Sequence, residues 1–175
     1  MNSRRSSKRS KIVSSAHLVS ERSAELSEYE YGLIVAGHAF NRWIVRCMAA
    51  ADGPELGPLD VLVLHTVNHR GREKRLADIC FVLNVEDTHT VNYALKKLVK
   101  HELVRSQRRG KEVAYSVTEA GAALCGRYRE VREDCLVSAL SALGTVDNTE
   151  IGAAGNVLRA LSGLYDQAAR AATSL

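Results

Sequence analysis

The stretch that decides the fold is DTHTVNYALKKLVKHELVRSQRRGKEVAYSVT, residues 87–118 of the 175-residue chain. Residues 87–100 have the periodicity of a helix, and residues 103–118 alternate like two strands around a basic turn. A shorter apolar helix, RLADICFVL at residues 75–83, precedes them after only a three-residue turn at 84–86. Two helices joined by a short turn and followed by a hairpin are typical of a winged helix-turn-helix.

The helix predicted at residues 87–100 has one apolar stripe and one polar face. The stripe, which suits packing on the preceding helix, comprises Val91, Ala94, Leu95, Leu98 and Val99. Asp87 or Thr88 can cap the first turn. Because the second helix of such a unit enters the major groove, the polar side chains are predicted to read bases: Thr88, His89, Thr90, Asn92, Tyr93 and Lys96. Asn92 suits adenine, and Lys97 and Lys100 are predicted to contact phosphates. The alternative is an ordinary solvated helix face.

The hairpin that follows carries a basic tip. Arg105, Arg108, Arg109 and Lys111 crowd around Gly110, which can adopt the positive φ of a tight turn. Beside a polar recognition helix, we expect Arg108, Arg109 and Lys111 to contact the DNA backbone or the minor groove. The alternative is that these cations only aid solubility.

Positive charge is concentrated in two segments. Residues 69–111 contain eleven Lys or Arg and five Asp or Glu, and residues 1–20 contain five basic residues and no acidic one. Because the whole chain has a net charge of only +4, the remainder is acidic. The basic, serine-rich residues 1–20 are predicted to form a disordered tail.

The remaining residues have helical patterns with apolar stripes. We predict a mainly α protein with a small β-hairpin wing: an N-terminal dimerisation helix at 21–52, the winged helix-turn-helix at 53–118 and C-terminal dimerisation helices at 119–175. Thr118 is predicted to cap a helix that continues past Cys135, and residues 147–150 to cap the last one. Apolar stripes at both ends of a single small domain suggest a homodimer interface.

Several classes of function find no support in the sequence. No apolar run is long enough to span a membrane, and no apolar segment follows Arg4-Arg5, so we predict a cytoplasmic protein with no membrane partner. Without a glycine-rich phosphate loop or a nucleophile elbow, no enzymatic activity and no cofactor are predicted.

Cysteine and histidine spacings do not indicate a zinc site. The four cysteines, at positions 47, 80, 125 and 135, form no CxxC pair, and Cys80 is expected in the core. His65 and His69 are four residues apart, but no third ligand is evident, so a structural histidine pair is favoured over a metal site.

Particular strings resemble the MarR family of bacterial regulators. They are LADI at residues 76–79, TVNYALKKL at 90–98, LVR at 103–105 and VTEAG at 117–121. The resemblance covers about residues 25–170. It implies a homodimer with intertwined terminal helices that binds a palindromic operator, commonly as a repressor released by a small phenolic or lipophilic ligand or by cysteine oxidation. The family wing usually has an Asp-x-Arg pair, whereas Gln107-Arg108-Arg109 lacks the aspartate, so Arg108 or Lys111 could replace Arg109.

The resemblance also implies an effector pocket between the dimerisation helices and the DNA-binding lobe. Its lining here would comprise Phe40, Arg42, Trp43, Cys47 and His65. An aromatic ring beside a cation and a thiol would suit a flat anionic ligand. The alternative is that Phe40 and Trp43 belong to the dimer core.

Together these patterns predict a dimeric, sequence-specific transcriptional regulator that binds double-stranded DNA, with a small-molecule effector as a candidate partner. The alternative is a winged helix that serves only as a protein-interaction module.

Overall fold

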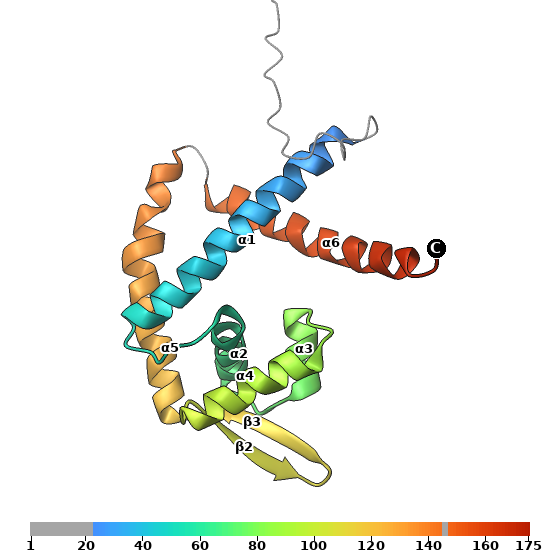
Figure 1. The fold of residues 1–175 in the computed structure, drawn as a ribbon. Helices are drawn as coiled ribbons and strands as arrows, with labels where there is room; N and C mark the ends of the chain where they lie inside the picture. The colour runs from blue at the N-terminus through green and yellow to red at the C-terminus, as the bar shows by residue number, and fades with distance from the viewer. Residues whose placement is uncertain (1–22, 145–146) are drawn as a thin grey trace, which may run out of the picture. The chain divides into compact units, whose positions relative to one another are not determined.

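A computed structural model of the chain describes residues 23–144 and 147–175, so the tail predicted at residues 1–20 lies outside the described residues. The chain divides into two compact units, one ending at Arg132 and the other beginning at Glu133 (Figure 1). No helix in the described ranges combines the length and the apolar character that a membrane span requires.

Within residues 23–132, the first unit contains five α-helices, one short 3-10 turn and three strands, and it confirms the predicted order of elements. In chain order they are α1 (Ala24–Ala50), α2 (Pro58–Asn68), η2 (His69–Gly71), β1 (Lys74–Arg75), α3 (Leu76–Leu83), α4 (Thr88–Lys100), β2 (Val104–Arg109), β3 (Glu112–Val117) and α5 (Glu119–Arg132).

Helix α2 is the central helix of this unit, and residues of the turn itself stabilise its N-terminus. Pro58 stands at the first helical position, where proline costs little because a backbone N–H there would have no hydrogen-bond partner within the helix. The backbone N–H of Gly57 donates to Asp60 Oδ2 at 2.8 Å. Apart from this aspartate and Thr66, the buried positions of α2 are all aliphatic, as a helix surrounded by others requires.

Short-range capping explains how α3 and α4 follow one another so closely. Asp78 accepts a hydrogen bond from the backbone N–H of Arg75 and closes the first turn of α3. Asn84 ends α3 in the left-handed conformation (φ 52°), which asparagine tolerates better than most residues. Asp87 then caps α4 through the backbone N–H of His89, as one of the two predicted caps.

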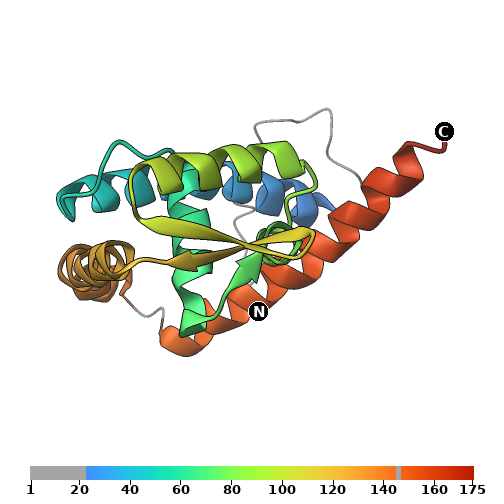
Figure 2. The ribbon, with the colours of Figure 1, turned by 90° about the horizontal axis from the view of Figure 1, so that it is seen from below.

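The wing is a three-stranded antiparallel sheet in the order β1-β3-β2. Its tip is a two-residue turn in which Gly110 has φ 62°, and Arg109 pairs with Glu112 across it. Figure 2 views the hairpin from below, with α4 running alongside it. Strand β1 is not predicted from the sequence, because two polar residues, Lys74 and Arg75, show no strand periodicity and become a strand only by pairing with Tyr115 and Ala114.

The predicted cap at Thr118 is confirmed and joins the wing to α5. Thr118 Oγ1 accepts from the backbone N–H of Gly121 at 3.0 Å and donates to the carbonyl of Glu102. Gly121 has no room for a side chain, since a Cβ there would lie 2.1 Å from the carbonyl oxygen of Leu103. The glycine of the TEAG string is therefore required by this close backbone contact.

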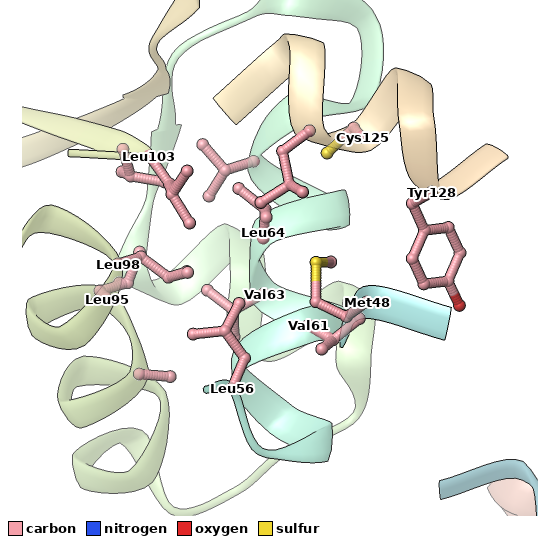
Figure 3. Close-up of a cluster of buried hydrophobic side chains, with 14 of the residues drawn as sticks. Met48, Leu56, Val61, Val63, Leu64, Leu95, Leu98, Leu103, Cys125 and Tyr128 are labelled. Carbon is pink, nitrogen blue, oxygen red and sulfur yellow. The ribbon is translucent and has the colours of Figure 1, made fainter. Parts of the chain in front are cut away.

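A single apolar core holds the first unit together, with side chains from α1, α2, α3, α4, β2 and α5 (Figure 3). Leu64, Leu95 and Leu98 are fully buried. The apolar stripe predicted on residues 87–100 faces this core: Val91, Ala94, Leu95 and Leu98 are buried, and Val99 packs at its edge. Cys80 is also in the core, as predicted.

The second unit begins where regular α-helix geometry ends. The single helix predicted to run past Cys135 is wrong, because the chain changes to a π turn, η3 (Glu133–Val137), and then a 3-10 turn, η4 (Ser138–Leu143). Helix α6 (Asn148–Ala172) then starts at the predicted cap, with Asp147 accepting from the backbone N–H groups of Thr149 and Glu150. No residue of α6 is buried.

Candidate nucleic-acid interface

The six predicted base-reading residues all lie on α4, but they divide among three directions. Because an α-helix turns once in 3.6 residues, positions at i, i+4, i+7 and i+11 share one face. Opposite the buried stripe, this outermost face carries His89, Tyr93, Lys96 and Lys100. All four are exposed, and Tyr93 retains 72% of its surface even though it is aromatic. An exposed tyrosine between cations on a helix is a feature that folding alone does not require.

Thr88 and Asn92 occupy the flank of α4 that faces the wing. With Val113 and Tyr115 of β3 they line a cleft of about 480 Å³ between helix and wing. Arg75 and Glu112 lie at the same cleft. Partial burial raises the pKa of Tyr115, so its hydroxyl remains protonated and able to donate a hydrogen bond near neutral pH.

Thr90 and Lys97 occupy the opposite flank, where both groups already have partners. Thr90 Oγ1 donates to the carbonyl of Asp87 at 2.7 Å. Lys97 Nζ lies 2.9 Å from Asp60 Oδ2, and the hydrogen bond to this carboxylate raises the pKa of Lys97. Asp60 is only 8% exposed. This ion pair joins α4 to the first turn of α2, and the contact of Lys97 with phosphate stays a prediction.

Two arginines at the wing also have acidic partners within the chain. Arg109 Nη2 lies 3.1 Å from Glu73 Oε1, and Arg75 Nη1 lies 3.0 Å from Glu112 Oε2. Arg108 donates from Nε to the carbonyl of Gly110, which leaves its charge uncompensated. Glu73 is the residue that sequence reasoning missed, because it reaches Arg109 across 36 positions.

The remaining predicted backbone contacts carry free charge. Among the residues that the structure describes, Lys96, Lys100 and Lys111 have no acidic partner within ion-pair distance, and all three are exposed. With Arg108 they place four available cations on α4 and the wing tip. Unpaired cations beside an exposed polar helix suit a polyanion such as the DNA backbone.

The five residues predicted to line an effector pocket differ widely in exposure, and the pocket itself stays a prediction. Cys47 is in the core (1% exposed), where its Sγ donates to the carbonyl of Tyr128 at 3.5 Å. Trp43 packs at the edge of that core, while Phe40 and Arg42 lie on exposed positions of α1. The helical spacing that placed these side chains together could not show which of them face inward.

Of these five residues, His65 lines a cavity in the part of the chain that the structure describes. This cavity has a volume of about 330 Å³, lies between α2 and α3, and also contacts Leu62, His69 and Val82. The ring of His65 stacks edge-on against Tyr128, with 4.4 Å between centroids. Burial lowers the pKa of His65, and its Nε2 is buried without a hydrogen-bond partner.

Three of the four cysteines are poorly placed for thiol chemistry. Cys47, Cys80 and Cys125 are buried, whereas Cys135 is exposed. Burial raises the pKa of Cys80 and raises that of Cys125 to about 11, which disfavours the reactive thiolate. Within residues 23–144 and 147–175, no group of three or more potential ligands could bind a metal ion.

Comparison with known proteins agrees with this geometry. Residues 56–121 match the family model described as a winged helix DNA-binding domain. That segment begins just before α2 and ends at Gly121, so it contains α4 and the whole wing. No relative among the curated proteins matches the chain by sequence.

Solved structures extend the likeness beyond this segment. A MarR family regulator from Neisseria meningitidis is similar with a TM-score of 0.63 at 18% identity, covering 82% of this chain and 95% of that one. MarR from Staphylococcus aureus, in complex with salicylate and kanamycin, has a TM-score of 0.63 at 13% identity, covering 83% and 95%. A mutant MarR from E. coli complexed with operator DNA has a TM-score of 0.57 at 18% identity, covering 74% and 93%.

These likenesses define the class of the protein at the level of fold. The chain contains a winged helix of the DNA-binding type, and the predicted resemblance to the MarR family is confirmed for the architecture.

Proposed function

We propose that this chain is a sequence-specific DNA-binding transcriptional regulator that acts as a homodimer on an inverted repeat, most simply as a repressor. The observation that carries the proposal is the outer face of α4, where exposed polar and basic side chains lie beside a wing tip with free cations. That arrangement combines groups that can read base edges with groups that can bind phosphate.

The homodimer is supported by apolar side chains that the chain does not cover. Helix α1 exposes Ile34, Val35 and Phe40 at 57%, 51% and 51%. Helix α6 exposes Ile151, Val157, Leu158 and Leu164, which occupy one broad face. Patches of this kind on terminal helices suit an interface with a second copy, in which each helix meets its symmetry mate or neighbour.

Genome-wide footprinting of the full chain on its host's DNA tests the proposal directly. An inverted repeat with half-sites about one helical turn apart would support a dimeric regulator. Diffuse binding that disappears at moderate salt would instead mean non-specific contact with phosphate, and the alternative of a protein-interaction module would then be favoured.

Base reading by α4 is tested at Asn92. Asn92→Ala should cost about 1–3 kcal/mol of binding free energy on the operator and relax the preference at one base position. Asn41→Ala, an exposed position on α1, is the matched control and should change neither. Equal weakening on all DNA sequences would exclude a base-reading role for Asn92.

A small-molecule effector is the second part of the proposal. The cavity at His65 is largely apolar but is also lined by the cation Lys74, a combination that suits a small aromatic acid. Salicylate, the molecule named with the Staphylococcus aureus structure, is a practical probe. Titration of salicylate into the DNA complex should release DNA, and His65→Leu should reduce that release. Release that is unchanged in His65→Leu would exclude this cavity.

A further inference from the structure

We infer that Glu73 and Glu112 compete with DNA for the arginines at the base and tip of the wing and thereby limit its affinity for phosphate. The inference rests on the proposed DNA-binding function, which it deepens by separating the cations that DNA can use from those that the chain already neutralises.

The four residues come from the region of all three strands of the wing and form two ion pairs. Arg109 and Glu112 are directly opposed in the β2–β3 register, on either side of the turn. Each nevertheless has its ion-pair partner elsewhere: Glu73, just before β1, pairs with Arg109, and Arg75 of β1 pairs with Glu112. All four side chains line one polar cavity of about 270 Å³, so they share a single electrostatic environment.

The pairs are open to solvent, and therefore to competition. The side chains of Arg75 and Glu112 are 63% and 56% exposed, and those of Arg109 and Glu73 are 58% and 43% exposed. Ion pairs this exposed are weak, so a phosphate can displace the carboxylate. The displaced carboxylate nevertheless remains tethered beside the phosphate and repels it. Each pair therefore presents DNA with almost no net charge.

Six cations of α4 and the wing fall into two groups. Lys96, Lys100, Arg108 and Lys111 have no carboxylate partner among the described residues and are available to DNA. Arg75 and Arg109 are occupied. An interface with six unopposed cations on α4 and the wing would bind any duplex tightly, whereas two opposed arginines leave more of the discrimination to α4.

The experiment measures binding of the full chain to a random-sequence duplex over a range of salt concentrations, by fluorescence anisotropy. Glu73→Gln/Glu112→Gln should raise the affinity on the order of tenfold at low salt. It should steepen the slope of log K against log salt by up to about 1.8, since each freed arginine releases about 0.9 counterion.

Two further variants control for charge and for folding. Glu130→Gln together with Glu119→Gln removes two exposed glutamates on α5 and makes the same change in net charge without freeing either arginine, so it should alter the slope little. The quadruple variant in which Glu73, Arg75, Arg109 and Glu112 all become glutamine has the net charge of the wild type. It should bind like the wild type if the pairs are electrically neutral units.

The other outcomes are distinct. A loss of affinity in Glu73→Gln/Glu112→Gln, with an unchanged melting temperature, would overturn the inference and show that the glutamates brace the wing. An unchanged affinity and slope would also overturn it, while leaving DNA binding intact. Wild-type protein that binds no duplex at any salt concentration would remove the proposed function itself.

Discussion

The winged helix and the terminal helices carry similar apolar patterns, but most of the apolar side chains are buried only in the winged helix. In the winged helix, Leu95 and Leu98 of α4 are fully buried, and α2 is surrounded on several sides. Helix α6 buries no residue, and α1 buries only Ile44, Cys47 and Met48 near its C-terminal end. The difference teaches that periodicity reports an apolar face without reporting what covers it. The proposed homodimer would cover these faces with a second chain.

The same substitution in the two regions gives the largest expected contrast. Leu95→Ala should lower the free energy of unfolding by about 2–5 kcal/mol, because it leaves a cavity in the core. Leu158→Ala, at a position that is 45% exposed, should change the unfolding of the isolated chain little. Chemical denaturation at low protein concentration measures both. Equal losses would mean that α6 is already buried within its own chain.

A charged substitution on α6 tests directly whether this helix forms a dimer interface. Leu158→Glu should raise the dissociation constant of self-association at least about tenfold, because a dimer interface would have to bury an unpaired carboxylate. Gln167→Glu adds the same charge at an exposed polar position of α6 and is the control. Sedimentation velocity over a concentration series reads the result. A dimer that tolerates both variants would place the interface elsewhere.

Charged groups show the same contrast, since Lys97 has an acidic partner in Asp60 and Lys100 has none among the described residues. Lys97→Met should lower the free energy of unfolding by about 1–3 kcal/mol, because it removes one partner of the nearly buried Asp60. It should leave the salt slope of DNA binding unchanged, whereas Lys100→Met should reduce that slope by about 0.9 without affecting stability. The reverse pattern would support Lys97 as a phosphate contact.

The smallest expected effect concerns His65, a polar group inside the satisfied region whose Nε2 lacks a partner. Burial lowers the pKa of His65 below its ordinary value of 6.5. The folded state therefore binds the proton less readily than the unfolded state does. Stability due to this group is present above pH 6.5 and is lost as the pH falls from there to the lowered folded pKa.

Melting temperatures measured between pH 5 and 8 check this expectation. His65→Phe should flatten the dependence relative to the wild type, while His69→Gln, at an exposed position, should leave it unchanged. A dependence that survives His65→Phe would assign the titration to another group.

Local sequence signals predicted the fold well because each acts over a few residues. The cap at Asp87, the turn at Gly110 and the Thr118 cap all depend on neighbours within four positions. The apolar stripe of α4 depends on helical spacing alone, and it too is confirmed.

What the sequence could not show depends on tertiary pairing. Lys97 reaches Asp60 across 37 positions and Arg109 reaches Glu73 across 36, and no local pattern marks either pair. Strand β1 likewise exists only because β3 lies beside it. Helical spacing likewise could not distinguish the buried Cys47 from the exposed Phe40, so it could not show which of the predicted pocket residues face inward.

The joint at Gly121 has a mechanical consequence. Its backbone lies so close to the carbonyl of Leu103 that no Cβ would fit, and Leu103 donates in turn to Leu98 near the end of α4. Because the two backbone segments are in such close contact, we expect α5 and the start of β2 to move as one rigid body. A small rotation of α5 would therefore displace the tip of the wing, at Gly110, by more than it displaces the start of β2.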